Sequence, residues 1–191
     1  MVLDCCRNLA HRDEKKVNEM IIRALEASDT TDMQAIYAHH VLHGTGTFEE
    51  TPPSVEEMAE RWQRVAARGW SWLAASDATG LLGFGYFSQF RDRYAYRFTA
   101  EDSLYVREDV RGQGVGKALV AALVEAAAAQ GFRQMIAVIG DSENVSSIGV
   151  HASLGFQKIG VLRAVGFKFG RWLDVVQMQR ALGAHEPDQA A

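Results

Sequence analysis

The sequence predicts one α/β domain with a mixed central β-sheet and about four flanking helices. Three observations predict it: strand-like and helix-like segments alternate along the chain, a glycine-rich loop joins one strand to an alanine-rich helix, and the composition suits a single compact core. The chain has 191 residues, of which 48% are hydrophobic and 23% are charged, so we expect one domain.

The first third of the chain holds a strand and two helices. A strand-like run covers 21–25. A helix over about 29–43 follows, and its opening Asp-Thr-Thr-Asp supplies N-cap oxygens and first-turn negative charge. A second helix covers about 54–69, where Ser54 and Glu57 form a plausible capping box.

The middle of the chain holds three strands, a helix and a fourth strand. The runs at 70–75 and 81–87 are joined by an Asp-Ala-Thr-Gly turn, as in a hairpin, and a further strand covers about 99–106. A glycine-rich loop then opens a helix over about 114–131. The short apolar run at 134–139 is typical of a covered strand.

The last part holds a helix and two strands, at 142–154, 156–161 and 172–178. The resulting order, β-α-α-β-β-β-α-β-α-β-β, predicts a mixed sheet with helices on both faces. We expect this domain to cover 20–182, with a flexible extension at 1–19 and a tail at 183–191.

Charge, apolar runs and cysteines argue against several classes of protein. A net charge of −4 argues against broad nucleic-acid affinity. The longest apolar stretch, 118–129, contains Glu125 and is too short to cross a bilayer. Cys5 and Cys6 are adjacent, which suits neither a disulfide framework nor a metal site. We therefore expect a cytoplasmic protein without a metal, a nucleic-acid partner or a membrane anchor.

The glycine-rich loop is the most informative motif, and it reads Arg111, Gly112, Gln113, Gly114, Val115, Gly116, Lys117. Glycines lack the Cβ atoms that would block close approach, and a helix N-terminus offers unpaired N–H donors, so a diphosphate is the natural ligand. A Walker A loop is excluded because only three residues separate Gly112 from Gly116 and Ala118 follows the lysine. The dinucleotide fingerprint is excluded because Lys117 stands where its third glycine is required.

The remaining pattern, Arg111-x-x-Gly114-x-Gly116, resembles the pyrophosphate loop of the GNAT superfamily of N-acetyltransferases, which bind acetyl-coenzyme A. An ordinary glycine-rich turn before a helix is the alternative. More motifs resemble the phosphinothricin acetyltransferase branch: Thr47–Glu49, Arg91–Tyr96, Phe98–Glu101, Ala137–Gly140, Asn144, Ser147–Ile148, His151, Leu154–Phe156 and Gly166–Asp174. The resemblance covers about 20–182, and several ordered motifs together are more specific than any one.

This resemblance implies the GNAT fold, acetyl-CoA as cofactor and a homodimer. Members of the branch acetylate the α-amino group of amino acids and of toxic analogues such as phosphinothricin, methionine sulfoximine and methionine sulfone. The sequence departs from the branch in Tyr37–His40, where an asparagine often follows the tyrosine.

Two catalytic candidates follow from the resemblance. The amine must lose a proton before it attacks a thioester, and Glu101 corresponds to the glutamate proposed as base; a polar strand-end residue is the alternative. His151 stands where many relatives have a tyrosine that protonates the leaving sulfur. It follows Asn144 by seven residues and so shares its helix face, and its imidazole could donate that proton or act as base. A structural histidine is the alternative.

Cofactor contacts beyond the loop are expected on one strand and one helix. By the family pattern, the strand Leu104, Tyr105, Val106 offers a backbone N–H to the oxyanion. Asn144 would bond the cofactor arm, with Ser147 and Ser153 as weaker candidates whose alternative roles are helix capping and surface packing. Lys117 either neutralises phosphate or is solvated.

The expected acceptor site is lined by Arg91, Arg93, Phe48, Tyr96 and Val165. Arg91 and Arg93 would point to one side of an extended segment and hold an oxyanionic group. The other three, with Tyr105, would form apolar walls by the family pattern, although aromatic residues are more often core than site. Two other functions stay open: acetylation of another amine (a protein N-terminus, polyamine or aminoglycoside), and non-catalytic sensing of acyl-CoA.

Overall fold

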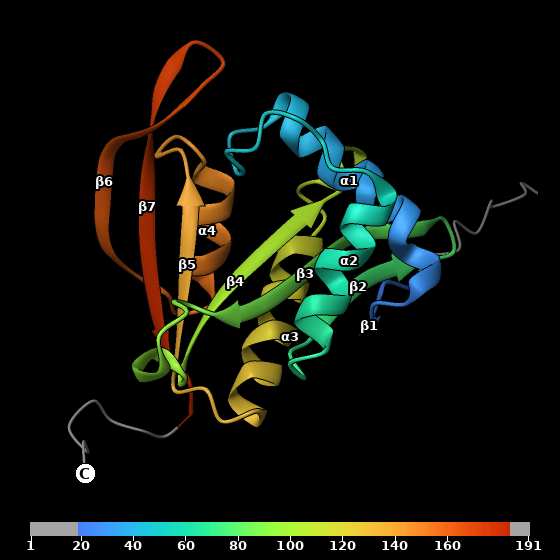
Figure 1. The fold of residues 1–191 in the computed structure, drawn as a ribbon, viewed down its shortest axis with the longest axis horizontal. Coiled ribbons are helices and arrows are strands. Elements are labelled where there is room, and N and C mark those ends of the chain that lie inside the picture. The colour runs from blue at the N-terminus through green and yellow to red at the C-terminus, as the bar shows by residue number, and fades with distance from the viewer. Residues whose placement is uncertain (1–18, 184–191) are drawn as a thin grey trace, which may run out of the picture.

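The computed structural model describes residues 19–183, which form one seven-stranded sheet with helices on both faces (Figure 1). The elements are β1 (Ile21–Ala24), α1 (Thr30–His43), α2 (Val55–Ala66), β2 (Trp72–Asp77), β3 (Gly80–Gln89), β4 (Thr99–Val106), α3 (Val115–Ala129), β5 (Gln134–Gly140), α4 (Val145–Ser153), β6 (Gln157–Lys168) and β7 (Arg171–Ala181). Their order is the one that the sequence predicts, and the predicted mixed sheet is confirmed. The expected extension and tail lie almost wholly outside the described residues.

The strands follow the order β1-β2-β3-β4-β5-β7-β6, and β4–β5 is the parallel pair in this sheet. Helices α1 and α2 pack on one face, in a core with Met33, Met58 and Phe84. Helix α3 packs on the other face through Leu119 and Leu123, with α4 beside it. The sheet therefore separates two cores and presents different side chains to each.

The parallel pair β4–β5 separates partway along its length. Its paired residues run from Thr99 opposite Gln134 to Asp102 opposite Ala137. Beyond that point both strands continue, to Val106 and to Gly140, each bonded on its other side to β3 or β7. The diverging strands leave unpaired backbone groups facing each other, which is a place for a polar ligand.

Several predicted boundaries differ from the structure. Strands β6 and β7 are longer than predicted because they form one hairpin, closed by Phe169 and Gly170, whose φ angles of 52° and 73° suit a tight two-residue turn. Helix α4 begins after Asn144, because the Asn144 side chain accepts a hydrogen bond from Ser147 N and caps it there.

Of the capping box predicted for α2, the structure has the bond to the Ser54 side chain but not the reciprocal bond from Glu57, and the predicted side-chain cap of α1 is absent. Ser54 accepts a hydrogen bond from Glu57 N. Asp29 makes no cap bond to α1. Its carboxylate instead accepts bonds from Glu26 N and from the Arg23 guanidinium, at 2.6–2.8 Å. The charged Arg23 guanidinium is a stronger hydrogen-bond donor for the Asp29 carboxylate than a neutral backbone N–H of α1.

Candidate active site

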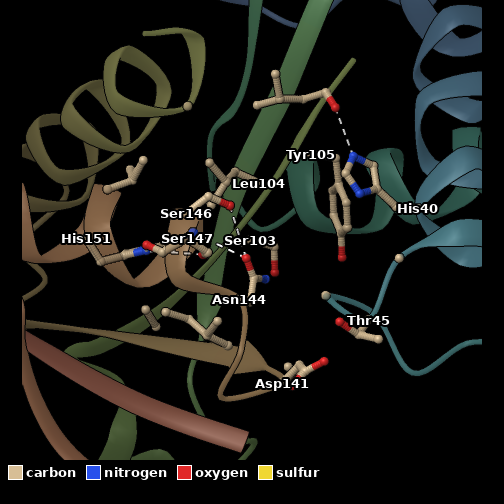
Figure 2. A pocket seen from close by; sticks show the side chains of 18 of the residues that line it. His40, Thr45, Ser103, Leu104, Tyr105, Asp141, Asn144, Ser146, Ser147 and His151 are labelled. Carbon is tan, nitrogen blue, oxygen red and sulfur yellow. Dashed lines mark hydrogen bonds between the residues drawn. The ribbon is translucent and has the colours of Figure 1, made fainter. Parts of the chain in front are cut away.

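A cavity of about 700 Å³ opens where β4 and β5 diverge. Its walls come from β4, β5, the start of α3, the helix α4, the end of α1 with the segment that follows it, and Arg171 at the start of β7 (Figure 2). Of the predicted site residues, those that line it are Leu104, Tyr105, Val106, Arg111, Gly116, Asn144, Ser147 and His151. These residues are far apart in sequence, and the separation of β4 from β5 brings them together.

The glycine loop has the geometry that a phosphate ligand requires. Gly112 and Gly114 have φ angles of 77° and 88°, and Gly114 is the N-cap of α3. No atom lies within 4 Å of a methyl group built on either residue, so the backbone conformation, and not lack of space, demands glycine. The first amides of α3 have no acceptor within the helix and sit at the positive end of its dipole.

The remaining loop residues are placed beside the cavity. Gln113 and Lys117 are exposed and do not line it, and the Val115 side chain is buried in the core. Arg111 bonds Glu108 and reaches Ser146 at the start of α4, so it ties the two helix N-termini together. The residues present thus fit a diphosphate group held by backbone amides, with basic side chains at the rim.

Asn144 serves the helix and faces the cavity at the same time. Its Oδ1 accepts bonds from Ser147 N at 3.3 Å and from Ser146 Oγ at 3.2 Å. The cap uses the carbonyl oxygen, which leaves the side-chain NH₂ group for a ligand acceptor. Ser153 differs, because it is exposed, lies outside the cavity lining and donates its hydroxyl to Val150 O.

His151 is buried, and each of its ring nitrogens has a hydrogen-bond acceptor within reach. Nδ1 donates to Ser147 O at 2.8 Å, and Nε2 lies 3.0 Å from Asp102 Oδ2. Burial lowers the pKa of His151, but the bond and charge of Asp102 and the bond to Ser147 raise it, and the net pKa is above its ordinary value. The imidazolium form is therefore favoured.

Asp102 is a cavity residue that sequence reasoning missed. Its side chain is 1% exposed, and its Oδ1 is buried without a hydrogen-bond partner among the described residues. The available signal was the adjacent pair Glu101-Asp102 inside a strand: one of two neighbouring strand carboxylates must face each side of the sheet.

Glu101 and His151 therefore lie on opposite sides of β4. On one face Tyr105 packs edge-on against Tyr37 of α1, with ring centroids 4.7 Å apart. On the other face Leu104 lies against Gly116 of α3. Since side chains alternate along a strand, Glu101 shares the Tyr105 face, whereas Asp102, with its partner His151, shares the Leu104 face.

Glu101 is half-buried and is not part of the cavity lining. Burial raises the pKa of this carboxyl and the charge of Asp102 raises it further, while Arg91 opposes the shift. A carboxylate with a raised pKa is a stronger base than one with the ordinary value.

The prediction that Arg91 and Arg93 lie on an extended segment is wrong. Residues 91–93 form bends followed by a 3₁₀ turn, η2 (Tyr94–Tyr96), and Arg93 N donates to Arg91 O at 2.8 Å, so the segment is not extended. Alternation of side chains does not apply in such a turn. Arg91 is still near enough to Glu101 to lower the pKa of that carboxyl.

The apolar acceptor candidates lie outside the cavity lining. The Phe48 ring lies where methyl groups on Gly140 and Gly166 would meet it. Tyr96 packs against Phe90, with ring centroids 5.8 Å apart. None of Phe48, Tyr96 and Val165 belongs to the cavity lining, and all three are more than one-third exposed.

Two further polar groups of the cavity were not predicted. His40 donates from Nε2 to Val106 O at 2.9 Å, and it stands in the segment that departs from the family pattern. Asp141 lines the cavity in a left-handed conformation, with φ 71°, and pairs with Arg171 at 2.6 Å. Positive φ at a non-glycine residue cannot be read from a sequence.

Two features together are those of an acyl-CoA N-acyltransferase. One is a helix that starts at a glycine-rich loop, and the other is a neighbouring pair of parallel strands that separates. The chain belongs to the GNAT acetyltransferases, because the family model described as "Acetyltransferase (GNAT) domain" matches residues 22–177. The predicted GNAT fold and N-acetyltransferase class are thereby confirmed.

Two curated relatives and one solved structure are similar over most of the chain. A phosphinothricin N-acetyltransferase of Alcaligenes faecalis is 48% identical, over 85% of this chain and 83% of the relative. An L-methionine sulfoximine/L-methionine sulfone acetyltransferase of Pseudomonas aeruginosa is 42% identical, over 83% and 92%. A crystal structure of a Sinorhizobium meliloti phosphinothricin acetyltransferase with acetyl-CoA has a TM-score of 0.83 and 45% identity, and covers 90% of this chain and 95% of that chain.

Residues 19–183 lack two kinds of feature. They contain no group of three or more His, Cys, Asp or Glu side chains placed to hold a metal ion. None of their helices has the length and apolar character to span a bilayer.

Proposed function

We propose that this protein transfers the acetyl group of acetyl-CoA to the α-amino group of a small amino acid or toxic analogue, of the kind represented by phosphinothricin, methionine sulfoximine and methionine sulfone. The observation that carries the proposal is the similarity to enzymes named for these acceptors, at 48% and 42% identity over most of the chain. The cavity between β4 and β5, with a phosphate-type loop at its edge, supports acetyl-CoA as the donor.

In this proposal acetyl-CoA supplies the activated acetyl group as a thioester. The α3 amides and Arg111 bind its diphosphate, and the NH₂ group of Asn144 bonds its arm. A backbone N–H group of β4 at 104–106 polarises the acetyl carbonyl. Its support is the unpaired edge that β4 presents to the cavity beyond Asp102.

Glu101 is proposed to take the proton from the substrate ammonium, directly or through water. Its support is the raised pKa that burial and Asp102 produce, which makes the carboxylate a stronger base than an ordinary glutamate. His151 is proposed to complete proton transfer at the departing sulfur. Because Ser147 O and Asp102 bind both ring nitrogens, it can act as a donor only if one of these bonds gives way.

We also propose a homodimer with a cytoplasmic location. Support for the dimer is the row of exposed apolar side chains on the β6–β7 hairpin, where Val165, Phe167 and Trp172 are 54%, 56% and 67% exposed.

The acceptor is proposed to be a small molecule, in keeping with a net charge of −4, which does not favour nucleic acid.

The test is release of free thiol from acetyl-CoA in the presence of phosphinothricin, methionine sulfoximine, methionine sulfone, spermidine, an aminoglycoside and a short peptide. We expect turnover with the first three alone. Turnover with only the polyamine, aminoglycoside or peptide would refute the acceptor class. Tight acetyl-CoA binding in calorimetry without turnover of any amine would instead indicate a sensor.

A further inference from the structure

Lys168, near the end of β6, is a buried lysine with no role in the reaction described above. The residue is 1% exposed, which is rare for a lysine. Its ammonium donates to Gly44 O at 2.9 Å and to Thr47 O at 2.8 Å. Both acceptors belong to the segment 44–49 between α1 and α2, so the lysine joins two parts of the chain separated by more than a hundred residues.

The 44–49 segment forms one wall of the cavity. Gly44, Thr45 and Gly46 line it, and Figure 2 shows Thr45 on this segment and Asn144 at the start of α4. A chain without regular secondary structure has few hydrogen bonds of its own, so its position depends on outside anchors.

Two kinds of contact fix this segment besides the lysine. Thr47 Oγ1 lies 3.1 Å from Tyr37 OH of α1, and Glu49 pairs with Arg61 of α2 at 2.7 Å. These contacts hold the side of the segment that faces the helices. Lys168 holds the opposite side, against the sheet.

Close backbone packing makes the fit on the sheet side specific. A methyl group on Gly140 would overlap with Thr45 O, and one on Gly166 would overlap with the Phe48 ring. The segment therefore contacts the sheet at two glycines, one on β5 and one on β6, where any larger residue would overlap with it. Lys168 bonds the carbonyls of Gly44 and Thr47, each one residue before one of these contacts.

We infer that Lys168 is a positioning residue: its ammonium holds the 44–49 segment, with Phe48, in the place that forms the acceptor side of the site. The inference rests on the proposed transfer of acetyl groups to amino acids. Charge-assisted bonds to two carbonyls are stronger than neutral ones, and an apolar replacement leaves both carbonyls, of which Thr47 O is buried, without that donor. The phosphate-type loop at 112–116 makes none of these contacts, so we expect binding of the cofactor's diphosphate to depend little on them.

The experiment compares Lys168→Met with Lys158→Met, which removes an exposed lysine of the same strand. For Lys168→Met we expect the KM of the amino-acid acceptor to rise about tenfold or more, while the Kd of acetyl-CoA in calorimetry changes less than about threefold. Lys158→Met should change neither. An unchanged acceptor KM, or an equal rise in the acceptor KM and the acetyl-CoA Kd, overturns the inference.

Hydrogen exchange separates failure of this inference from failure of the proposed function. If the wild-type protein acetylates no amino acid, the acceptor class is wrong, but the lysine is still tested: Lys168→Met must speed exchange of the 44–49 amides and leave those of 112–117 unchanged. Equal exchange in both proteins overturns the inference. If Lys168→Met does not fold, Gly166→Ala displaces Phe48 from the other side and must raise the acceptor KM; an unchanged value overturns the inference.

Discussion

At the scale of single residues, the chemistry depends on which side of β4 each carboxylate faces. Glu101 faces α1 and α2, and the adjacent Asp102 faces α3 and α4, where it bonds His151. Burial raises the pKa of Glu101, whereas Asp102 stabilises a neighbouring positive charge. Two neighbouring residues of the same charge type thus lie in different surroundings, and we propose a different role for each.

Replacing Glu101 by Gln tests its role as base. We expect kcat to fall by about 10²- to 10⁴-fold, because general-base catalysis contributes this much, and the Kd of acetyl-CoA to stay unchanged, because Glu101 does not line the cavity. Steady-state thiol release and calorimetry measure the two quantities. Glu125→Gln, an exposed change on α3, is the control. Full activity in Glu101→Gln would exclude the residue as base.

The His151–Asp102 pair predicts how stability depends on pH. The pKa of His151 is raised in the folded protein above 6.5, so the folded state binds the proton more tightly than the unfolded state. The resulting stabilisation is complete below pH 6.5 and is lost as the pH rises through the folded pKa. It amounts to about 1.4 kcal/mol for each pH unit by which the folded pKa exceeds the unfolded pKa.

Urea unfolding at a series of pH values measures this effect. We expect the difference in free energy of unfolding between the wild type and His151→Gln to shrink as the pH rises across that window. A difference that does not vary with pH would show that His151 is not held as an imidazolium.

At the scale of elements, α3 depends on the left-handed glycine at its start. Gly114→Ala places a side chain at φ 88°, which costs about 1–2 kcal/mol, and it should also raise the Kd of acetyl-CoA by tilting the first amides of the helix. Thermal unfolding and calorimetry measure the two effects. Gly149→Ala in α4, where φ is ordinary and the space is open, should instead stabilise by about 1 kcal/mol. Equal effects of the two changes would contradict this account.

The separation of β4 and β5 is a second property of elements. Their pairing stops at Asp102, and the cavity begins where it stops. The wall opposite α4 is an irregular segment held at several points, among them Lys168. Where the strands separate, their unpaired backbone N–H and C=O groups are available to a ligand. Substitution of side chains does not remove these groups.

At the scale of the whole molecule, the β6–β7 hairpin exposes several large apolar side chains to solvent, which is typical of a surface that binds another protein chain. Phe167→Glu is expected to convert the proposed dimer to a monomer, because a buried unpaired charge is costly at an apolar interface. Light scattering with size-exclusion chromatography measures the mass. Ile21→Glu, at the opposite edge of the sheet, is the control, since its side chain is 52% exposed. A wild-type monomer would refute the dimer.

The sequence by itself determined the order of the elements and the phosphate-type loop. These are local properties: hydrophobic periodicity, caps such as Ser54, and the spacing of Gly112, Gly114 and Gly116 all act within a few residues. Their signal therefore survives without knowledge of the fold. The hairpin turn at Phe169-Gly170 is as local, but the strands on either side of it were predicted too short.

Only the tertiary structure decided which groups meet. His151 meets Asp102 from 49 residues away, and Lys168 meets Thr47 from 121 residues away. Such contacts form because buried polar groups must find partners wherever the packed chain brings them, and no local pattern encodes that choice. The side of the sheet on which His151 packs was decided in the same way.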